Sequence, residues 1–191
     1  KRANYVLTGS WSEKALKEAK FSGEAVASVS TKENKYKNIP TEIEVGENDA
    51  YVHITSNNTI YGTQWKTFPE TGNVPLIADM SSDIMSKPVD ISKFGMIYAG
   101  AQKNLGPSGV TVAIIRKDLL ESANTNLPTM LKYDTFVANN SLYNTPPTFG
   151  IYMLGEVLKW IEAQGGLEQV AKNNEAKAAL IYDAIDNSNG F

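Results

Sequence analysis

The sequence contains no cysteine, and this absence excludes several kinds of site at once. Without cysteine the chain can form no disulfide framework, zinc–thiolate site, iron–sulfur cluster or cysteine nucleophile. Its only histidine is His53, so the chain cannot by itself build a multi-histidine metal centre or a Ser-His-Asp hydrolase. We therefore predict no metal site. The lack of cysteine is also compatible with a reducing compartment.

Long apolar runs and an excess of positive charge are missing as well. No run approaches the ~20 residues that a helix needs to span a bilayer. Lysine and arginine together number 18 against 21 aspartates and glutamates, so no basic stripe attracts nucleic acid or an anionic membrane. We expect a soluble cytoplasmic protein that binds neither nucleic acid nor membrane. An organellar targeting segment ahead of the first residue stays an open alternative.

What is present suffices for one large domain or two small ones. The chain has 191 residues, of which 42% are hydrophobic and 20% charged, and this composition excludes a disordered chain. A single domain of this size buries about 70% of its unfolded surface and needs no disulfides. The chain opens on Lys1 and Arg2 without a methionine, which we interpret as the beginning of a piece of something longer.

Short apolar runs recur over the first 115 residues and predict strands. We expect these strands at 3–8, 25–29, 51–55, 75–79, 96–99 and 110–115. The last three do not alternate between apolar and polar residues, which is typical of parallel strands buried on both faces. A serine cap and an apolar face predict a helix over 12–20, and the polar residues 31–49 predict a surface connection.

The pattern becomes helical after residue 147. Helices are expected over 149–163 and 167–185, interrupted by Gly165 and Gly166. Buried strands joined by helical crossovers predict an α/β fold, specifically a three-layer α/β/α sandwich around a mostly parallel sheet. Such sheets bind ligands at the carboxyl ends of their strands.

The most informative stretch is 98–109, where Lys103 lies between an apolar strand and a glycine-rich turn. A lysine that loses its hydration there becomes the amine nucleophile that Schiff-base chemistry requires. The stretch is not a nucleotide P-loop, because it lacks a Gly-Lys-Ser/Thr triplet. The alternative is an ordinary solvated loop lysine, which at most positions is the more frequent case.

Asp79 ends an apolar strand some two dozen residues earlier. A carboxylate buried there needs a cationic partner, because burying it alone costs several kcal/mol. A pyridinium nitrogen would serve, and a lysine with an aspartate is the pair that a pyridoxal phosphate site uses. A helix N-cap for the following segment is the alternative, and the residue type alone leaves both open.

The block Ala-Gly-Ala-Gln-Lys-Asn-Leu-Gly-Pro-Ser-Gly around Lys103 resembles the cofactor-lysine motif of the phosphoserine aminotransferase family, in class V of the pyridoxal-phosphate-dependent aminotransferases. Further blocks are similar to that family in its own order: Tyr5-Val-Leu-Thr-Gly-Ser-Trp-Ser, Asp79-Met-Ser-Ser, Ser86-Lys-Pro-Val-Asp-Ile-Ser-Lys-Phe-Gly95, Ser141-Leu-Tyr-Asn-Thr-Pro-Pro-Thr148 and Ile185-Asp-Asn-Ser-Asn-Gly-Phe191. The resemblance implies the large domain of a fold-type-I enzyme of the aspartate aminotransferase kind, incomplete at both ends. Residues 1–165 would be the central part of that domain. Residues 166–191 would be a helix leading toward a C-terminal small domain.

The resemblance also implies pyridoxal 5′-phosphate as cofactor and gives roles to particular residues. Lys103 would hold the cofactor as a Schiff base and move a proton between the substrate Cα and the cofactor C4′. Asp79 would keep the pyridine nitrogen protonated. Trp11 would stack on the ring, and Thr59 would hydrogen-bond the phenolic oxygen. By composition alone, Trp11 is as well explained by packing and Thr59 by a turn.

The phosphate of the cofactor has its own implied ligands. Gln102 would contact it from the same subunit, whereas Asn144 and Thr145 resemble the pair that reaches it from the neighbouring subunit. A homodimer with a shared site follows, although Asn144 to Pro147 also suits a helix entry. His53 receives no role from the family, and because it shares a strand face with Tyr51 and Thr55 we expect it to be structural.

The implied reaction is a reversible amino transfer from L-glutamate to 3-phosphonooxypyruvate. It yields O-phospho-L-serine and 2-oxoglutarate in serine biosynthesis, and in many organisms a related step serves vitamin B6 synthesis. Another class V aminotransferase or lyase, and a noncatalytic α/β binding module, are the alternatives. Asn57-Asn58-Thr59 stands where the family often has Asn-Glu-Thr. The phosphate-cradling turn and the basic substrate-binding residues would lie outside this chain, so alone it is expected to be inactive.

Overall fold

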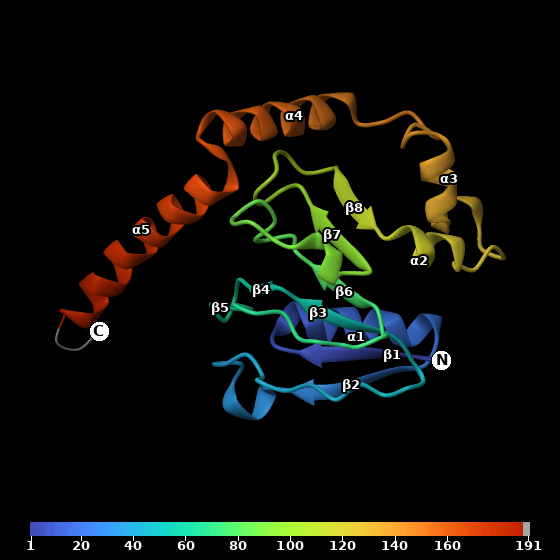
Figure 1. The fold of residues 1–191 in the computed structure, drawn as a ribbon, viewed down its shortest axis with the longest axis horizontal. Coiled ribbons are helices and arrows are strands. Elements are labelled where there is room, and N and C mark those ends of the chain that lie inside the picture. The colour runs from blue at the N-terminus through green and yellow to red at the C-terminus, as the bar shows by residue number, and fades with distance from the viewer. Residues whose placement is uncertain (189–191) are drawn as a thin grey trace.

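The computed structural model describes residues 1–188, and its framework is a six-stranded sheet in the order β2-β1-β3-β6-β7-β8 (Figure 1). The strands are β1 (Arg2–Leu7), β2 (Ala25–Ser30), β3 (Asp49–Thr55), β6 (Leu76–Asp79), β7 (Met96–Gly100) and β8 (Thr111–Ile115). All neighbouring pairs run parallel except β7 with β8. The predicted mostly parallel sheet is confirmed.

Helices and short turns connect these strands. The helices are α1 (Ser10–Ser22), α2 (Lys117–Glu121), α3 (Tyr133–Ala138), α4 (Thr148–Ala163) and α5 (Gly166–Asp186), with 3-10 turns η1 (Lys32–Asn34), η2 (Ile91–Lys93) and η3 (Thr129–Leu131). A small antiparallel hairpin, β4 (Asn57–Asn58) with β5 (Thr63–Gln64), follows β3. The sequence predicted only a turn there, because a strand of two residues is too short to produce an alternating pattern.

Helix α1 covers one face of the sheet. Its first turn closes around Ser12, whose Oγ accepts hydrogen bonds from the backbone N–H groups of Thr8 at 2.9 Å and Gly9 at 3.1 Å. Ser12 is therefore the third residue of the helix rather than its N-cap, and the helix begins at Ser10. Leu16 points toward the sheet, where it packs with Tyr5, Leu7 and Ala25.

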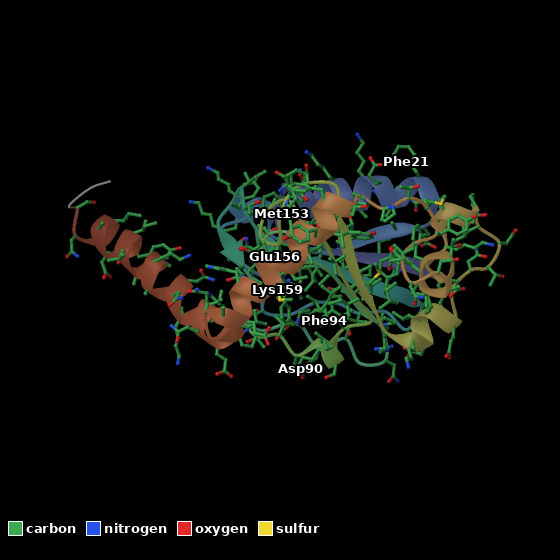
Figure 2. The ribbon with its side chains drawn as sticks, turned by 90° about the horizontal axis from the view of Figure 1, so that it is seen from above. Phe21, Asp90, Phe94, Met153, Glu156 and Lys159 are labelled. Atoms are coloured by element: carbon green, nitrogen blue, oxygen red, sulfur yellow. The ribbon has the colours of Figure 1, made fainter. Side chains whose placement is uncertain are left out.

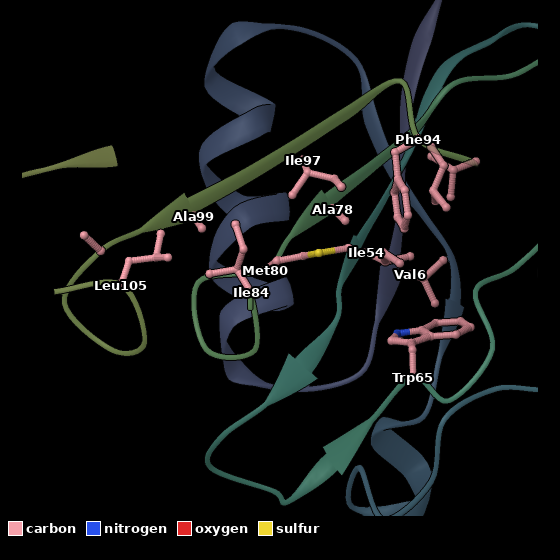
Figure 3. Packing of buried hydrophobic residues seen from close by; sticks show 13 residues of the cluster. Val6, Ile54, Trp65, Ala78, Met80, Ile84, Phe94, Ile97, Ala99 and Leu105 are labelled. Carbon is pink, nitrogen blue, oxygen red and sulfur yellow. The ribbon is translucent and has the colours of Figure 1, made fainter. Parts of the chain in front are cut away.

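The opposite face of the sheet carries the main core. Side chains alternate along each strand, so β3 sends Val52 and Ile54 into this core and His53 and Thr55 to the other face. Figure 3 shows the packing, which gathers Val6, Ile54, Trp65, Ala78, Met80, Ile84, Phe94, Ile97, Ala99 and Leu105. Fully burying such a side chain contributes about 1.5–3 kcal/mol, which makes this cluster the main source of stability.

Strand β8 departs from the expectation of a parallel strand buried on both faces. It pairs antiparallel with β7, and Thr111, Ala113 and Ile114 are exposed. The prediction was wrong because a short apolar run looks the same in the centre of a sheet and at its edge. The position of the strand in the sheet, which tertiary structure decides, determines its burial.

Helices α4 and α5 follow the expected break in the chain. Gly165 and Gly166 both have positive φ angles, 98° and 77°, which end α4 and start α5. Helix α4, which carries Met153, Glu156 and Lys159 in Figure 2, packs partly buried side chains on the core, whereas α5 projects away from the body in both views (Figures 1 and 2). The domain division at residue 165 stays a prediction, and residues 189–191 lie outside the described part.

No helix in the described part of the chain combines the length and the apolar character needed to cross a bilayer.

Candidate active site

One pocket of about 230 Å³ lies at the carboxyl ends of the central strands. Its lining is Trp11, Thr55, Asn57, Asp79, Ser81, Ser82, Gln102 and Lys103. Parallel strands end at the same edge of a sheet, which is why residues that follow β1, β3, β6 and β7 meet here. The fold thus brings together Trp11, Asp79, Gln102 and Lys103, four of the residues that the sequence pointed to.

Lys103 and Trp11 are direct neighbours in this pocket. The Lys103 Nζ lies 5.4 Å from the centroid of the Trp11 ring, and the Lys14 Nζ lies at 4.5 Å. Both distances are in the range of cation–π contacts, so the indole face attracts positive charge. Lys103 is nevertheless exposed, which corrects the expectation of a desolvated lysine. Within the described residues the mouth of the pocket is open, so solvent reaches the amine.

Asp79 is held by the turn that follows β6. Its Oδ1 accepts hydrogen bonds from the Ser81 backbone N–H at 2.9 Å and from the Ser81 hydroxyl at 2.6 Å. The Ser81 hydroxyl in turn accepts the Gly100 N–H at 3.1 Å, which ties the ends of β6 and β7 together. A turn rather than a helix follows Asp79, so the helix-cap alternative is wrong. The other oxygen, Oδ2, accepts no hydrogen bond within residues 1–188.

Thr55 is a pocket residue that the sequence reasoning did not identify. It pairs with Asp79 in the register of β3 and β6, and its side chain is buried. Its Oγ1 has no hydrogen-bond partner among the described residues. Leaving a buried hydroxyl unsatisfied costs about 1–3 kcal/mol, so the group is poised for a ligand atom in the pocket. The alternation of side chains along β3 could have identified it, because this alternation puts Thr55 on the same face of the sheet as Asp79.

Polar contacts within and below the pocket lining hold it in place. The Asn57 amide donates to the Ser82 hydroxyl at 3.0 Å, which joins the hairpin to the turn after β6. Asp83, in the same turn, accepts hydrogen bonds from Ser56 and from the Gln64 amide. Burial raises the pKa of Asp83, and these two donors oppose the rise. Asp83 thus anchors the turn from beneath the pocket, whose lining does not include it.

Three of the predicted site residues lie outside the pocket. Thr59 is exposed after β4. Asn144 and Thr145 are exposed in the segment before α4, where the Asn144 amide donates to the Thr145 carbonyl at 3.2 Å. The structure does not bring these residues to Lys103 within one chain, and their roles stay predictions.

His53 lies behind the pocket rather than in it. Its Nε2 and the Tyr98 Oη are 2.9 Å apart, and the imidazole is buried. Burial lowers the pKa of His53 to about 4, while the nearby Asp79 acts in the opposite direction. The histidine therefore stays neutral at physiological pH, on the strand face that the sequence predicted.

The chemistry of the lining suits an organic ligand. Among the described residues, no group of three or more histidine, aspartate or glutamate side chains could hold a metal ion. The pocket offers one carboxylate, one amine, one exposed indole and several hydroxyl and amide groups, a set that matches a flat ring with a cationic nitrogen and polar substituents. The pocket, at about 230 Å³, is smaller than the roughly 300–1,000 Å³ common for ligand pockets.

Comparison with known proteins gives consistent results. The sequence matches the Aminotransferase class-V family over residues 19–191. A phosphoserine aminotransferase of Lysinibacillus sphaericus is 73% identical over 192 residues, covering 100% of this chain and 53% of the relative. The solved phosphoserine aminotransferase from Bacillus circulans subsp. alkalophilus has a TM-score of 0.98 at 62% identity, covering 100% of this chain and 54% of that one.

A more distant structure is similar along almost the same length. The phosphoserine aminotransferase of Trichomonas vaginalis with bound pyridoxal phosphate has a TM-score of 0.91 at 39% identity, over 97% of this chain and 56% of that one. The chain spans about half the length of the curated relatives it matches. Sequence, fold and pocket agree, and the chain belongs to the class-V aminotransferase family.

Proposed function

We propose that this chain is the central part of the large domain of a phosphoserine aminotransferase with pyridoxal 5′-phosphate as its cofactor. The observation that carries the proposal is the meeting of Lys103, Asp79 and Trp11 at one pocket. The 73% identity to a curated phosphoserine aminotransferase supports it, as does the similarity to a structure with bound pyridoxal phosphate.

The residues of the pocket fit this cofactor. Asp79 presents an oxygen that no described residue occupies, and Thr55 presents a buried hydroxyl without a partner among residues 1–188. The indole of Trp11 offers a face on which an aromatic ring can stack. Pyridoxal phosphate, when bound, supplies an aldehyde that takes up the amino group and a ring that withdraws electrons from the substrate carbon.

Each side chain of the proposed site has its own role. Lys103 supplies the amine that holds the cofactor and then moves a proton to or from the substrate Cα, which a lysine performs once it is neutral. Asp79 pairs with the ring nitrogen and keeps its proton in place, because an adjacent carboxylate favours the protonated form. Gln102 and, from the neighbouring subunit, Asn144 and Thr145 are the proposed ligands of the phosphate. Thr59 is the proposed donor to the phenolic oxygen.

The proposed reaction exchanges an amino group for a keto oxygen between two acids. L-glutamate gives up its amino group and leaves as 2-oxoglutarate. 3-Phosphonooxypyruvate takes up that group and leaves as O-phospho-L-serine, and both directions are open. We place the complete enzyme in serine biosynthesis and the cytoplasm, as a homodimer with a shared site. A contribution to pyridoxine synthesis is part of the same proposal.

Borohydride reduction of the full-length protein tests the cofactor lysine. We expect reduction to attach the cofactor irreversibly to the peptide that contains Lys103, as mass spectrometry of the digest reads out. Lys103→Ala should abolish both the attachment and the activity. Lys14→Ala is the matched control, because Lys14 is also a lysine beside Trp11, and it should keep both. Turnover of phosphoserine by Lys103→Ala at the parent rate would contradict the proposal.

The substrate is tested separately from the cofactor. The full-length protein is supplied with glutamate and either 3-phosphonooxypyruvate or unphosphorylated pyruvate. We expect strong preference for the phosphorylated acceptor. Equal rates would favour another class V aminotransferase, and a protein that takes up no cofactor would favour the binding module.

A further inference from the structure

A hydrogen bond between His53 and Tyr98 crosses strand β6 directly behind Asp79. The His53 Nε2 and Tyr98 Oη are 2.9 Å apart. In the register of the sheet, Asp79 has Thr55 on one side and Tyr98 on the other, whereas His53 pairs with Ile77. Tyr98 therefore starts beside Asp79 and leans back over Ile77 to reach the imidazole. We call this pair of side chains the His53–Tyr98 bridge.

The bridge stands between two hollows on the same face of the sheet. Asp79 and Thr55 line the pocket described above. His53, Ile77 and Tyr98 line a groove of about 710 Å³ that continues toward the amino ends of the strands. The two linings have no residue in common. In the register of β3 and β6, His53 and Ile77 come two residues before Thr55 and Asp79, so the bridge and Ile77 lie on the groove side of Asp79.

The bridge is itself held in place from behind. The ring of Tyr5 stacks on His53 with 4.7 Å between centroids and 29° between planes. The Tyr5 and Tyr51 hydroxyls are 3.1 Å apart, which links Tyr5 on β1 to β3, the strand that carries His53. His53 is 4% exposed and lies in desolvated surroundings, so its imidazole carries no charge at neutral pH.

The Asp79 carboxylate attracts a ligand cation most strongly when the side chains behind it carry no charge and exclude water. Asp79 Oδ1 is already occupied by Ser81, and Oδ2 is left for the pocket. A cationic imidazole at this position would compete with a ligand cation for that carboxylate. Water entering from the groove would hydrate it and weaken its attraction to a cation, because the attraction falls as the local dielectric rises.

We propose that the His53–Tyr98 bridge positions Asp79 for the cofactor by closing the rear of the pocket against water with a neutral hydrogen-bonded pair. Both residues are positioning residues that act through Asp79. The inference rests on the proposed function, since it assumes that Asp79 faces the cationic ring nitrogen of pyridoxal phosphate.

The test uses the full-length protein and pyridoxal 5′-phosphate, with two measurements: the dissociation constant of the cofactor and the pH dependence of its absorbance when bound. Tyr98→Phe removes the hydroxyl and keeps the ring. We expect it to weaken cofactor binding about fivefold to tenfold and to shift the pH at which the absorbance changes. The kcat should fall by a similar factor while the KM for glutamate stays unchanged. Tyr182→Phe, an exposed tyrosine on α5, is the matched control and should change none of these.

Substitutions of His53 separate positioning from packing. His53→Gln can still hydrogen-bond Tyr98 and should stay close to the parent protein, whereas His53→Leu fills the space without a hydrogen bond and should reproduce the loss seen in Tyr98→Phe. The double variant Tyr98→Phe/His53→Leu should be no worse than either single one, because the two residues act as a unit. If Tyr98→Phe does not fold, the comparison of His53→Gln with His53→Leu decides the question.

The outcomes distinguish this inference from the function on which it rests. A parent protein that binds no pyridoxal phosphate overturns the proposed function. The other outcome is that the parent protein binds the cofactor and that folded Tyr98→Phe and His53→Leu show the same dissociation constant and the same pH dependence. That outcome overturns only the proposed role of the His53–Tyr98 bridge.

Discussion

At the scale of single residues, Asp79 divides its two carboxylate oxygens between the protein and the pocket. Ser81 donates twice to Oδ1 and thereby fixes the rotation of the carboxylate. The same serine is tied to β7 through the Gly100 N–H. The acid is therefore oriented by its own turn before any ligand arrives, which spares the binding step the cost of ordering it.

Removing the charge of Asp79 while keeping its shape should reduce catalysis without unfolding the protein. A hydrogen bond to a charged group contributes about 1.5–3 kcal/mol, so Asp79→Asn should lower kcat roughly 10- to 150-fold. Steady-state kinetics of the full-length enzyme measures this. The control is Asp118→Asn, which breaks an exposed 2.6 Å ion pair with Arg116 and should leave the rate unchanged. An Asp79→Asn enzyme with the parent kcat would remove Asp79 from the mechanism.

The buried neutral His53 should make stability depend on pH. Burial lowers its pKa from 6.5 to about 4, with Tyr5 and Tyr98 against the ring and Asp79 nearby. Between these two values the unfolded chain binds a proton that the native chain does not, so stability falls as the pH falls, by at most about 1.4 kcal/mol per unit. Well above pH 6.5 neither state binds the proton, and His53 contributes no slope.

Urea unfolding of the full-length protein at about pH 7, 6 and 5 measures this effect. His53→Gln lacks the titrating ring, so its stability should decline less between these values than that of the parent protein. The carboxyl groups are common to both proteins, and their contribution cancels in the comparison. Parallel declines would mean that His53 is not buried as a neutral group.

At the scale of elements, the junction between α4 and α5 depends on backbone conformation rather than on contacts. Gly166 has a φ of 77°, and a methyl group placed on its Cα meets nothing within 4 Å. Gly155, in the middle of α4, has the same open space around it but lies in regular helix. An added methyl group clashes with nothing at either position, and only Gly166 has a positive φ. Alanine substitutions at the two positions therefore differ in conformational strain and not in steric clash.

Alanine at these two positions should have opposite effects on the free energy of unfolding. Gly166→Ala forces alanine into the left-handed region and should cost about 1–2 kcal/mol. Gly155→Ala improves helix propensity and should stabilise the protein by up to about 1 kcal/mol. Urea unfolding of both variants checks the signs. Equal shifts in one direction would mean that contacts outside this chain dominate at the junction.

At the scale of the whole molecule, a single chain does not bring all the proposed cofactor ligands to one place. The pocket holds Lys103, Asp79 and Trp11, yet Asn144 and Thr145 lie outside it. The proposed dimer resolves this difference, because a neighbouring subunit would bring the segment before α4 to the pocket. The open pocket mouth and the exposed Lys103 agree with that arrangement.

Mixing two inactive variants tests the shared site. Lys103→Ala lacks the cofactor lysine, and the double variant Asn144→Ala/Thr145→Ala lacks the proposed phosphate ligands. If these groups come from different subunits, one site of each mixed dimer is intact, and random mixing should restore about a quarter of the parent activity. No recovery after verified subunit exchange, or an active monomer in sedimentation, would contradict the shared site.

The sequence alone was enough to predict the fold class and the kinds of residue in the candidate site. Apolar runs and helical periods depend on neighbours within a few residues, so the strands, α1, α4 and the Gly165–Gly166 break were predictable. The blocks around Lys103 and Asp79 indicated a pyridoxal phosphate enzyme for the same reason, since each is a local motif. Short elements such as β4 left no such signal.

Tertiary structure alone decided how those residues face one another. The exposure of Lys103, the Thr55 hydroxyl without a partner among the described residues and the hydrogen bond between His53 and Tyr98 all depend on which strands are neighbours and in which register. The same holds for β8, whose composition suggested burial and whose place at the sheet edge exposes it. Register and strand order arise from contacts between segments far apart in the chain, and no local pattern encodes them.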